Sequence, residues 1–297
     1  MRLSDFVPPI AVKLARRLNR SHCLYEPQDL FESYEDALAV CKSGYEEDDL
    51  VNVVYEKTRL YRDLLLVQHP FVAEITSLRT LIALSLAIRG NELKVIDFGG
   101  ACGAHYFLSK SVFGKRIDLR WYVVETPKMV SKAVGLEDGQ LKFYDDLQKA
   151  KLAIGHADLV FSSGALQYVP RPYEFLEQLI ECSADNIFIT RVGLSTFPKE
   201  VVIVQKSNLS ANGPGPMPQG MRDEVVQYPA TFVRKDRFEE ILGQNYSLDI
   251  LFNEDKGAHQ AAGHSIDMYG YFGSIRNGTL CGAGEPPQHE SGRGEEL

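Results

Sequence analysis

Short apolar runs alternate with helical patterns along residues 93 to 193. Five of these runs have the length and the β-branched or aromatic content of buried strands. They are LKVIDF (93–98), RWYVVE (120–125), LKFYD (141–145), ADLVFSS (157–163) and NIFITRV (186–192). Because a plausible helix or turn follows each run, the alternation predicts a parallel sheet with helices on both faces.

Two later apolar runs follow each other with only a loop between them. YSLDILFN (246–253) and SIDMYGYFGSI (265–275) are therefore expected to pair antiparallel at the edge of the same sheet. Between the two groups of strands, residues 195–230 form a long excursion whose GPGPMP core (213–218) cannot be a regular element. Excursions of this length are commonly lids or binding loops. The pattern predicts one doubly wound α/β domain over 91–275, with 195–230 as a lid or insertion.

The chain before this domain has helical periodicity, and we expect residues 1–90 to form a helical N-terminal cap. Ser33 stands three positions before Asp36, which is the spacing of a capping box at a helix start. A helical face is predicted to be buried at Leu50, Val53, Val54, Leu60 and Leu64. The stretch LIALSLAI (81–88) is apolar almost all round, which predicts contacts on several sides of that helix.

Composition narrows the class of partner. The net charge is −8 over 297 residues, and no basic stripe follows residue 20, which argues against a nucleic acid. The five cysteines lie far apart without a CxxC pair, which favours a reduced compartment, and no signal peptide or membrane span is evident, so we expect a cytoplasmic protein. From 276 to 297, Gly, Pro and Glu predominate, which predicts a disordered tail.

Two weaker signals leave alternatives open. Ile10, Leu14 and Leu18 fall on one helical face beside basic residues, so this segment could make weak peripheral contact with an anionic membrane, although a docking helix is the plainer interpretation. His156, His259 and His264 have no metal-ligand spacing with another His, Cys or acid, and no metal site is predicted.

The most informative stretch is KVIDFGGACGAHYF, which follows the first predicted strand. Gly99, Gly100 and Gly103 permit positive φ, close approach of a ligand and a helix start tight against the strand. Ala101 and Cys102 separate Gly100 from Gly103, so the nicotinamide fingerprint G-x-G-x-x-G is not matched. Asp97 precedes the glycines, which suits a ligand that carries an ammonium group near the loop. Its alternative role is to cap the turn.

Acidic residues also end the second and third predicted strands. Glu125 lies 22 positions beyond Gly103 (125 − 103), close to the interval at which a carboxylate binds a pair of ribose hydroxyls. Asp145 or Asp146 could accept from an adenine amino group, although at least one of the two is expected to cap the following helix. A nucleoside-like ligand is therefore predicted across these strand ends.

In order and spacing, VIDFGGACG, VVETP, FYDDL and ADLVFSSGALQYVPRP resemble the first four motifs of class I S-adenosylmethionine-dependent methyltransferases. The wider chain, through FESYEDALAVCKSGYEEDDL, FITRV and QYPATFV, is similar to a little-characterised bacterial methyltransferase family associated with surface-polysaccharide genes. The resemblance implies a Rossmann-like, mostly parallel seven-stranded sheet with an antiparallel edge strand, and S-adenosylmethionine as cofactor. The departure is Ala101, where many methyltransferases have glycine; alanine is tolerable there if its φ stays negative.

On this resemblance, the expected reaction is O- or N-methylation of a small-molecule or sugar acceptor. The alternative is a non-catalytic, methyltransferase-like binding subunit of a glycan-assembly complex. Ser162 and Ser163 are expected beneath the cofactor, and Gln167 is expected to bind it where this superfamily often lines the methyl-transfer site. Tyr168 is expected at the methyl-transfer site, with His105 as a candidate base and Arg191 as a candidate anchor for an acidic acceptor. The structural alternatives are a packed histidine and a salt-bridged arginine. The acceptor and the oligomeric state are not indicated.

Overall fold

The computed structural model describes residues 30–41, 44–67, 74–261 and 264–276 of the 297-residue chain. Two regions with sequence predictions therefore lie outside the described residues. One is the amphipathic segment around Ile10, Leu14 and Leu18, and the other is the tail from 277 to 297.

A large, mostly parallel sheet forms the centre of the molecule, as the sequence predicted. Its order is β3-β2-β1-β4-β5, followed by β9 and then β8. β9 runs antiparallel to both neighbours, so β8, at the edge, has the same direction as β5. The bounds are β1 Glu92–Phe98, β2 Asp118–Val124, β3 Leu141–Tyr144, β4 Leu159–Ser163, β5 Asn186–Ser195, β8 Tyr246–Ala261 and β9 His264–Ile275.

The excursion at 195–230 contains two strands that the sequence analysis did not assign. β6 (Val201–Asn208) and β7 (Val225–Arg234) pair antiparallel, and the end of β7 pairs with Leu194 and Ser195 of β5. The β-branched runs VVIVQ and VVQYPATFV were the available signal for these strands. The GPGPMP core lies outside helices and strands, in the loop between β6 and β7.

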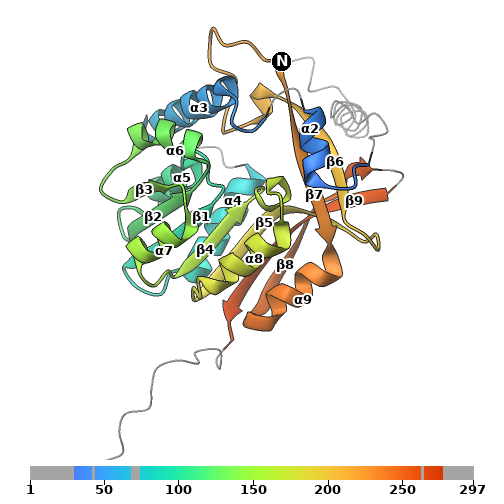
Figure 1. The fold of residues 1–297 in the computed structure, drawn as a ribbon. Coiled ribbons are helices and arrows are strands. Elements are labelled where there is room, and N and C mark those ends of the chain that lie inside the picture. The colour runs from blue at the N-terminus through green and yellow to red at the C-terminus, as the bar shows by residue number, and fades with distance from the viewer. Residues whose placement is uncertain (1–29, 42–43, 68–73, 262–263, 277–297) are drawn as a thin grey trace, which may run out of the picture.

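Helices cover both faces of the sheet (Figure 1). Helices α3, α4, α5 and α6 share one buried apolar cluster with one sheet face, and α7, α8 and α9 share a second cluster with the other face. Helix α2 packs instead on the β6–β7 hairpin. The bounds are α2 Tyr34–Val40, α3 Asp48–Val67, α4 Ile75–Ala87, α5 Ala104–Phe113, α6 Pro127–Ala133, α7 Leu147–Ile154, α8 Pro172–Glu181 and α9 Lys235–Asn245. Among the described residues, no helix has the length and apolar character needed to cross a membrane.

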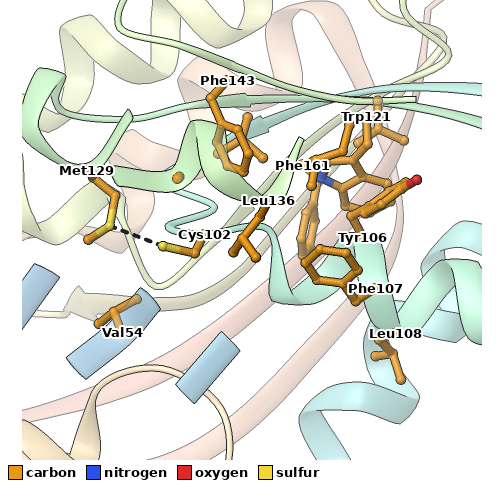
Figure 2. Packing of buried hydrophobic residues seen from close by; sticks show 14 of the residues in the cluster. Val54, Cys102, Tyr106, Phe107, Leu108, Trp121, Met129, Leu136, Phe143 and Phe161 are labelled. Carbon is orange, nitrogen blue, oxygen red and sulfur yellow. Dashed lines mark hydrogen bonds between the residues drawn. The ribbon is translucent and has the colours of Figure 1, made fainter. Parts of the chain in front are cut away.

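The first cluster supports the loop that follows β1. Figure 2 shows the rings of Tyr106, Trp121 and Phe161 gathered between α5 and the sheet. Nearby, the Cys102 thiol contacts the sulfur of Met129 at 3.5 Å. These side chains are fully or almost fully buried, so the loop packs on a close-packed part of the core.

The helical cap differs from its prediction in which faces are buried. Ser33 caps α2 as predicted, with its Oγ accepting from the N–H of Asp36 at 3.1 Å. On α3, Leu50, Val53 and Val54 are buried, but the predictions for Leu60 and Leu64 are wrong, because both are more than 40% exposed.

The interpretation of LIALSLAI is also wrong. Helix α4 buries one face through Thr80, Ala83, Leu84 and Ala87, whereas its apolar residues on the opposite side are exposed: Ile75, Leu78, Ile82 and Leu86. A run that is apolar all round predicts contacts on several sides only if neighbouring elements exist to supply them.

Candidate functional site

The loop after β1 has the tight backbone that its glycines predicted. Gly99 and Gly103 have φ of 70° and 80°, and a Cβ at Gly99 would overlap the side chain of Ala165 beyond β4. A Cβ at Gly100 would overlap the carboxylate of Asp97. A side chain at Gly99 or at Gly100 would therefore not fit the conformation of this loop.

The condition under which alanine is tolerable at position 101 is not met. Its φ is 49°, in the left-handed region, where a side chain is unfavourable. The Ala101 N–H donates to Oε1 of Glu125 at 3.1 Å, which holds this conformation in place. The glycine that many methyltransferases have at this position would relieve the strain.

Asp97 is fully buried at the end of β1. Its Oδ2 accepts a hydrogen bond from Trp121 Nε1 at 2.8 Å, while its Oδ1 has no hydrogen-bond partner. Burial raises the pKa of this carboxyl to about 7, the Trp121 bond opposes the shift, and the charge of Glu125 adds to it. The described residues provide no turn amide to Asp97, so the capping alternative finds no support there, and a buried acceptor atom faces the loop.

Glu125 lies at the end of β2, beside the loop. Its Oε2 accepts from the N–H of Thr126 at 2.9 Å, and its Oε1 accepts from Ala101. Burial raises its pKa, and these two backbone bonds act in the opposite direction. Each carboxylate oxygen can accept a second bond, which leaves capacity for a pair of hydroxyls.

Three predicted residues near the end of β4 also carry polar atoms without partners. The Oγ atoms of Ser162 and Ser163 and the Oε1 of Gln167 are buried and have no hydrogen bond. Gln167 is held by its other end, because its Nε2 donates to the carbonyl of Arg191 at 3.2 Å. Buried polar atoms normally have partners, so these unpaired atoms at the carboxyl ends of β1 and β4 mark candidate positions for a polar ligand.

The two aspartates after β3 have separate roles. Asp146 caps α7, with Oδ1 accepting from the N–H of Lys149 at 2.9 Å, as expected for one of the pair. Asp145 forms an exposed ion pair with the ammonium group of Lys149 at 2.8 Å. Asp145 is the one whose carboxylate is not occupied in a helix cap.

His105 lies in the first turn of α5, with its ring edge-on to Phe161 at a centroid distance of 4.9 Å. Burial lowers its pKa to about 4, and the charge of Arg191 adds to the effect. The imidazole is therefore neutral at pH 7, and burial is the main cause.

Arg191 lies in an irregularity of β5 and has φ of 55°. Its guanidinium packs beside Gly164, at the end of β4. The salt bridge considered as its structural alternative is absent among the described residues. The structure thus brings Arg191 and His105 together, from β5 and α5.

Three tyrosines from distant parts of the chain meet near this pair. Tyr45 stacks on Tyr168 at 5.8 Å between ring centroids, and Tyr228 of β7 lies edge-on to both. The Tyr168 hydroxyl donates to Gln205 Oε1 of β6 at 3.1 Å. The charges of Glu125 and Arg191 both influence the pKa of Tyr45, which burial raises above its usual value. Tyr45 therefore lies within electrostatic reach of both carboxylate and arginine.

Sequence reasoning missed Tyr45 and Tyr228, because no spacing connects a loop before α3 with a strand 183 positions later (228 − 45). It also missed Trp121 as the partner of Asp97, although the residue was visible within the second strand. Within the described ranges, no group of three His, Cys, Asp or Glu side chains could hold a metal ion.

The fold is a doubly wound α/β sheet, and Asp97, Glu125 and the two serines of β4 lie at the carboxyl ends of its strands. No protein-family model matches the sequence, and no curated protein matches it.

Solved structures similar to this fold include several methyltransferases. The CcbJ methyltransferase from Streptomyces caelestis aligns with a TM-score of 0.44 and 8% identity, covering 69% of this chain and 97% of that one. An S-adenosylmethionine-dependent methyltransferase from Clostridium acetobutylicum aligns at 0.44 and 10%, covering 75% and 99%. Magnesium protoporphyrin IX methyltransferase from Synechocystis, with bound S-adenosylhomocysteine, aligns at 0.40 and 16%, covering 77% and 100%. These likenesses are low, and the function must rest on the site's own residues.

Proposed function

We propose that the protein is an S-adenosylmethionine-dependent methyltransferase acting on a small-molecule or sugar acceptor. The observation that carries the proposal is the pair of carboxylates, Asp97 and Glu125, at adjacent strand ends around a glycine-containing loop. The four buried polar atoms without partners, from Asp97, Ser162, Ser163 and Gln167, support it, because a polar ligand would satisfy them.

The residues fit the cofactor part by part. Glu125 would bind the ribose hydroxyls. Asp97 would attract the cofactor's ammonium group, which would lie near the loop after β1. Gly99, Gly100 and Gly103 let the ligand approach the backbone. Asp145 would accept from the adenine amino group, whereas Asp146 is better suited to capping α7. Ser162, Ser163 and Gln167 would lie beneath the cofactor's amino-acid half.

When bound, S-adenosylmethionine supplies an already activated methyl group, so the protein's contribution is alignment and exclusion of water. Neutral His105 is a candidate to take a proton from a hydroxyl or amine acceptor. Tyr168, with Tyr45 and Tyr228, would present an aromatic wall to the acceptor. Residues 195–230 would complete this side as a lid or insertion on the domain of residues 91–275, and the loop before α3, within the proposed N-terminal cap of residues 1–90, would supply Tyr45.

A second candidate is a non-catalytic binding subunit of a glycan-assembly complex. The observation that favours it is the positive φ of Ala101, which strains the loop that should hold the cofactor. An association with surface polysaccharide and a cytoplasmic location belong to the proposal in either form.

Calorimetry with S-adenosylmethionine and S-adenosylhomocysteine tests the proposal. The wild type should bind both, and Glu92→Gln, an exposed change at the amino end of β1, should bind equally well. Absence of binding to either nucleoside would contradict the proposed cofactor. If S-adenosylmethionine binds but no methyl group is transferred to any member of a panel of acidic sugars, neutral sugars and other small molecules, the second candidate is favoured.

A further inference from the structure

The backbone of Arg191 is held in its unusual conformation from several sides. The Arg191 N–H donates to Glu254 Oε1 of β8 at 3.2 Å, and its carbonyl accepts from Gln167. Thr190 donates its hydroxyl to the same Glu254 oxygen. A positive φ at a residue other than glycine persists only where the surroundings impose it, and such residues cluster at functional sites.

Glu254 is itself a buried charge that is paired. Its side chain is 3% exposed, and its Oε2 accepts from Arg79 Nη1 of α4 at 2.7 Å. Gly270 of β9 leaves the room for it, because a Cβ there would overlap Glu254 Oε1. The desolvation penalty of a buried ion pair can exceed its Coulombic gain, so the Arg79–Glu254 pair is weak evidence for stability. A positioning role for the pair is therefore the better explanation.

The two arginines of this arrangement differ in one respect. Arg79 is neutralised by Glu254, whereas the guanidinium of Arg191 has no ionic or hydrogen-bonding partner among the described residues. Arg191 is exposed, its guanidinium lies beside Gly164 at the end of β4, and its charge acts on His105 and Tyr45. A guanidinium provides a rigid fork of donors that matches a carboxylate.

We propose that Arg191 binds a carboxylate at the reaction centre, and that the buried Arg79–Glu254 pair, with Thr190, is the positioning device that fixes it. This inference rests on the proposed function. The carboxylate is either that of the cofactor's amino-acid half or that of an acidic acceptor, and the same guanidinium geometry suits both.

The experiment has two arms. In the first, calorimetry compares S-adenosylhomocysteine with its decarboxylated analogue, which keeps the ammonium group. In the second, ligand-observed NMR compares glucuronate with glucose on protein saturated with S-adenosylhomocysteine. Each arm gives a carboxylate selectivity, defined as the ratio of the two affinities. General misfolding lowers both affinities together and leaves this ratio unchanged.

Arg191→Gln should lower the selectivity by roughly tenfold to a hundredfold in one arm, the scale of losing charged hydrogen bonds. A loss in the first arm assigns the carboxylate to the cofactor, and a loss in the second assigns it to the acceptor. Arg191→Lys should recover only part of it, because the ammonium keeps the charge without the fork.

The positioning role is tested by Glu254→Gln and, should that variant be unstable, by Thr190→Val, which keeps the side-chain shape. Each should lower the same selectivity by about threefold to tenfold, typical of coupled neighbours. Glu92→Gln, which breaks an exposed pair with Arg120, is the matched control and should leave it unchanged.

Unchanged selectivity of Arg191→Gln in both arms overturns the inference. A loss in Arg191→Gln without one in Glu254→Gln and Thr190→Val overturns the positioning role. Failure of the wild type to bind S-adenosylhomocysteine contradicts the proposed function instead, so the two failures are distinguishable.

Discussion

At the residue scale, the site is built from groups whose protonation and hydrogen bonding are set by burial. Asp97 and His105 are pushed in the same direction, toward their neutral forms, because each loses solvent. The pKa of Asp97 is raised to about 7 and that of His105 is lowered to about 4, so the two groups titrate in separate pH ranges. This separation allows the contribution of Asp97 to be measured by itself.

We expect the affinity for S-adenosylhomocysteine to rise between about pH 6 and pH 8. The pKa of Asp97 is raised to about 7 in the ligand-free protein, so its proton is lost across this window, and the carboxylate form attracts the ligand's ammonium group. Because the folded pKa is raised above the unfolded value near 4, the contribution of Asp97 to the stability of the ligand-free protein is lost as pH rises from about 4 to about 7. Calorimetry at several pH values measures the effect, and Asp97→Asn should flatten it. A slope that survives in Asp97→Asn would assign the titration to another group.

Glu125→Ala should weaken binding of S-adenosylhomocysteine by roughly 1 to 3 kcal/mol, the scale of lost charged hydrogen bonds. The change removes the acceptor proposed for the ribose hydroxyls and also releases the Ala101 N–H. Glu125→Gln keeps one acceptor oxygen, so its affinity for S-adenosylhomocysteine should fall by less than that of Glu125→Ala. Equal affinities for wild type and Glu125→Ala, measured by calorimetry, would place the ribose elsewhere.

At the element scale, the long excursion is attached to helix α3. Lys57 of α3 is almost completely buried, and its ammonium group donates to the carbonyl of Ser210 at 2.6 Å. Asp223 accepts from both the N–H and the hydroxyl of Ser210, which closes the loop on itself. Gly213 packs near the backbone of Val54 on the same helix. The loop between β6 and β7 is thus anchored to α3.

Lys57→Met should loosen that loop. The substitution keeps the apolar stem but leaves the Ser210 carbonyl without its donor, which costs about 1 to 3 kcal/mol of stability. Limited proteolysis should cut between residues 212 and 222 faster than in the wild type. Arg59→Met, on the exposed side of the same helix, serves as the control and should not change the cutting rate. Equal rates in all three proteins would show that Lys57 does not hold the loop.

At the scale of the whole molecule, two apolar clusters lie on opposite faces of one sheet. Hydrogen bonds of polar side chains connect neighbouring elements at the edges of these clusters, and Asp138 is an example. It accepts from Tyr106 and Lys110 of α5 and from the backbone N–H groups of Gln140 and Leu141 at β3. Burial alone would raise its pKa, but these bonds outweigh it and lower the pKa to about 2.

Asp138 should therefore contribute to acid stability. Because its folded pKa is depressed, its contribution is present above the unfolded value near pH 4 and is lost as pH falls toward 2. The free energy of unfolding in urea, measured from pH 6 to pH 2.5, should be lower for Asp138→Asn at pH 6 and converge with the wild type at the acid end. Asp63→Asn, at an exposed pair on α3, should not converge in this way. Parallel curves for wild type and Asp138→Asn would refute the assignment.

Much of the fold could be predicted from local pattern. The five strands from β1 to β5 follow their apolar runs, and Ser33 and Asp146 cap helices as their spacing indicated. Asp97 and Glu125 could be assigned to neighbouring strand ends because parallel strands present their carboxyl ends at one edge. Hydrophobic periodicity and glycine placement depend on a few neighbouring residues, so they can be recognised in a single sequence.

Other features depended on contacts between distant segments. The exposure of Leu60 and Leu64 was decided by which elements exist to cover α3, and the positive φ of Ala101 by the carboxylate of Glu125 beside it. The meeting of Tyr45 with Tyr228, and the support of Arg191 by Glu254 and Arg79, join residues separated by 63 to 183 positions (254 − 191; 228 − 45). Sequence alone determined the sheet and the acidic strand ends. Only the tertiary structure decided the surroundings of the candidate site, because burial and charge pairing arise when remote segments pack together.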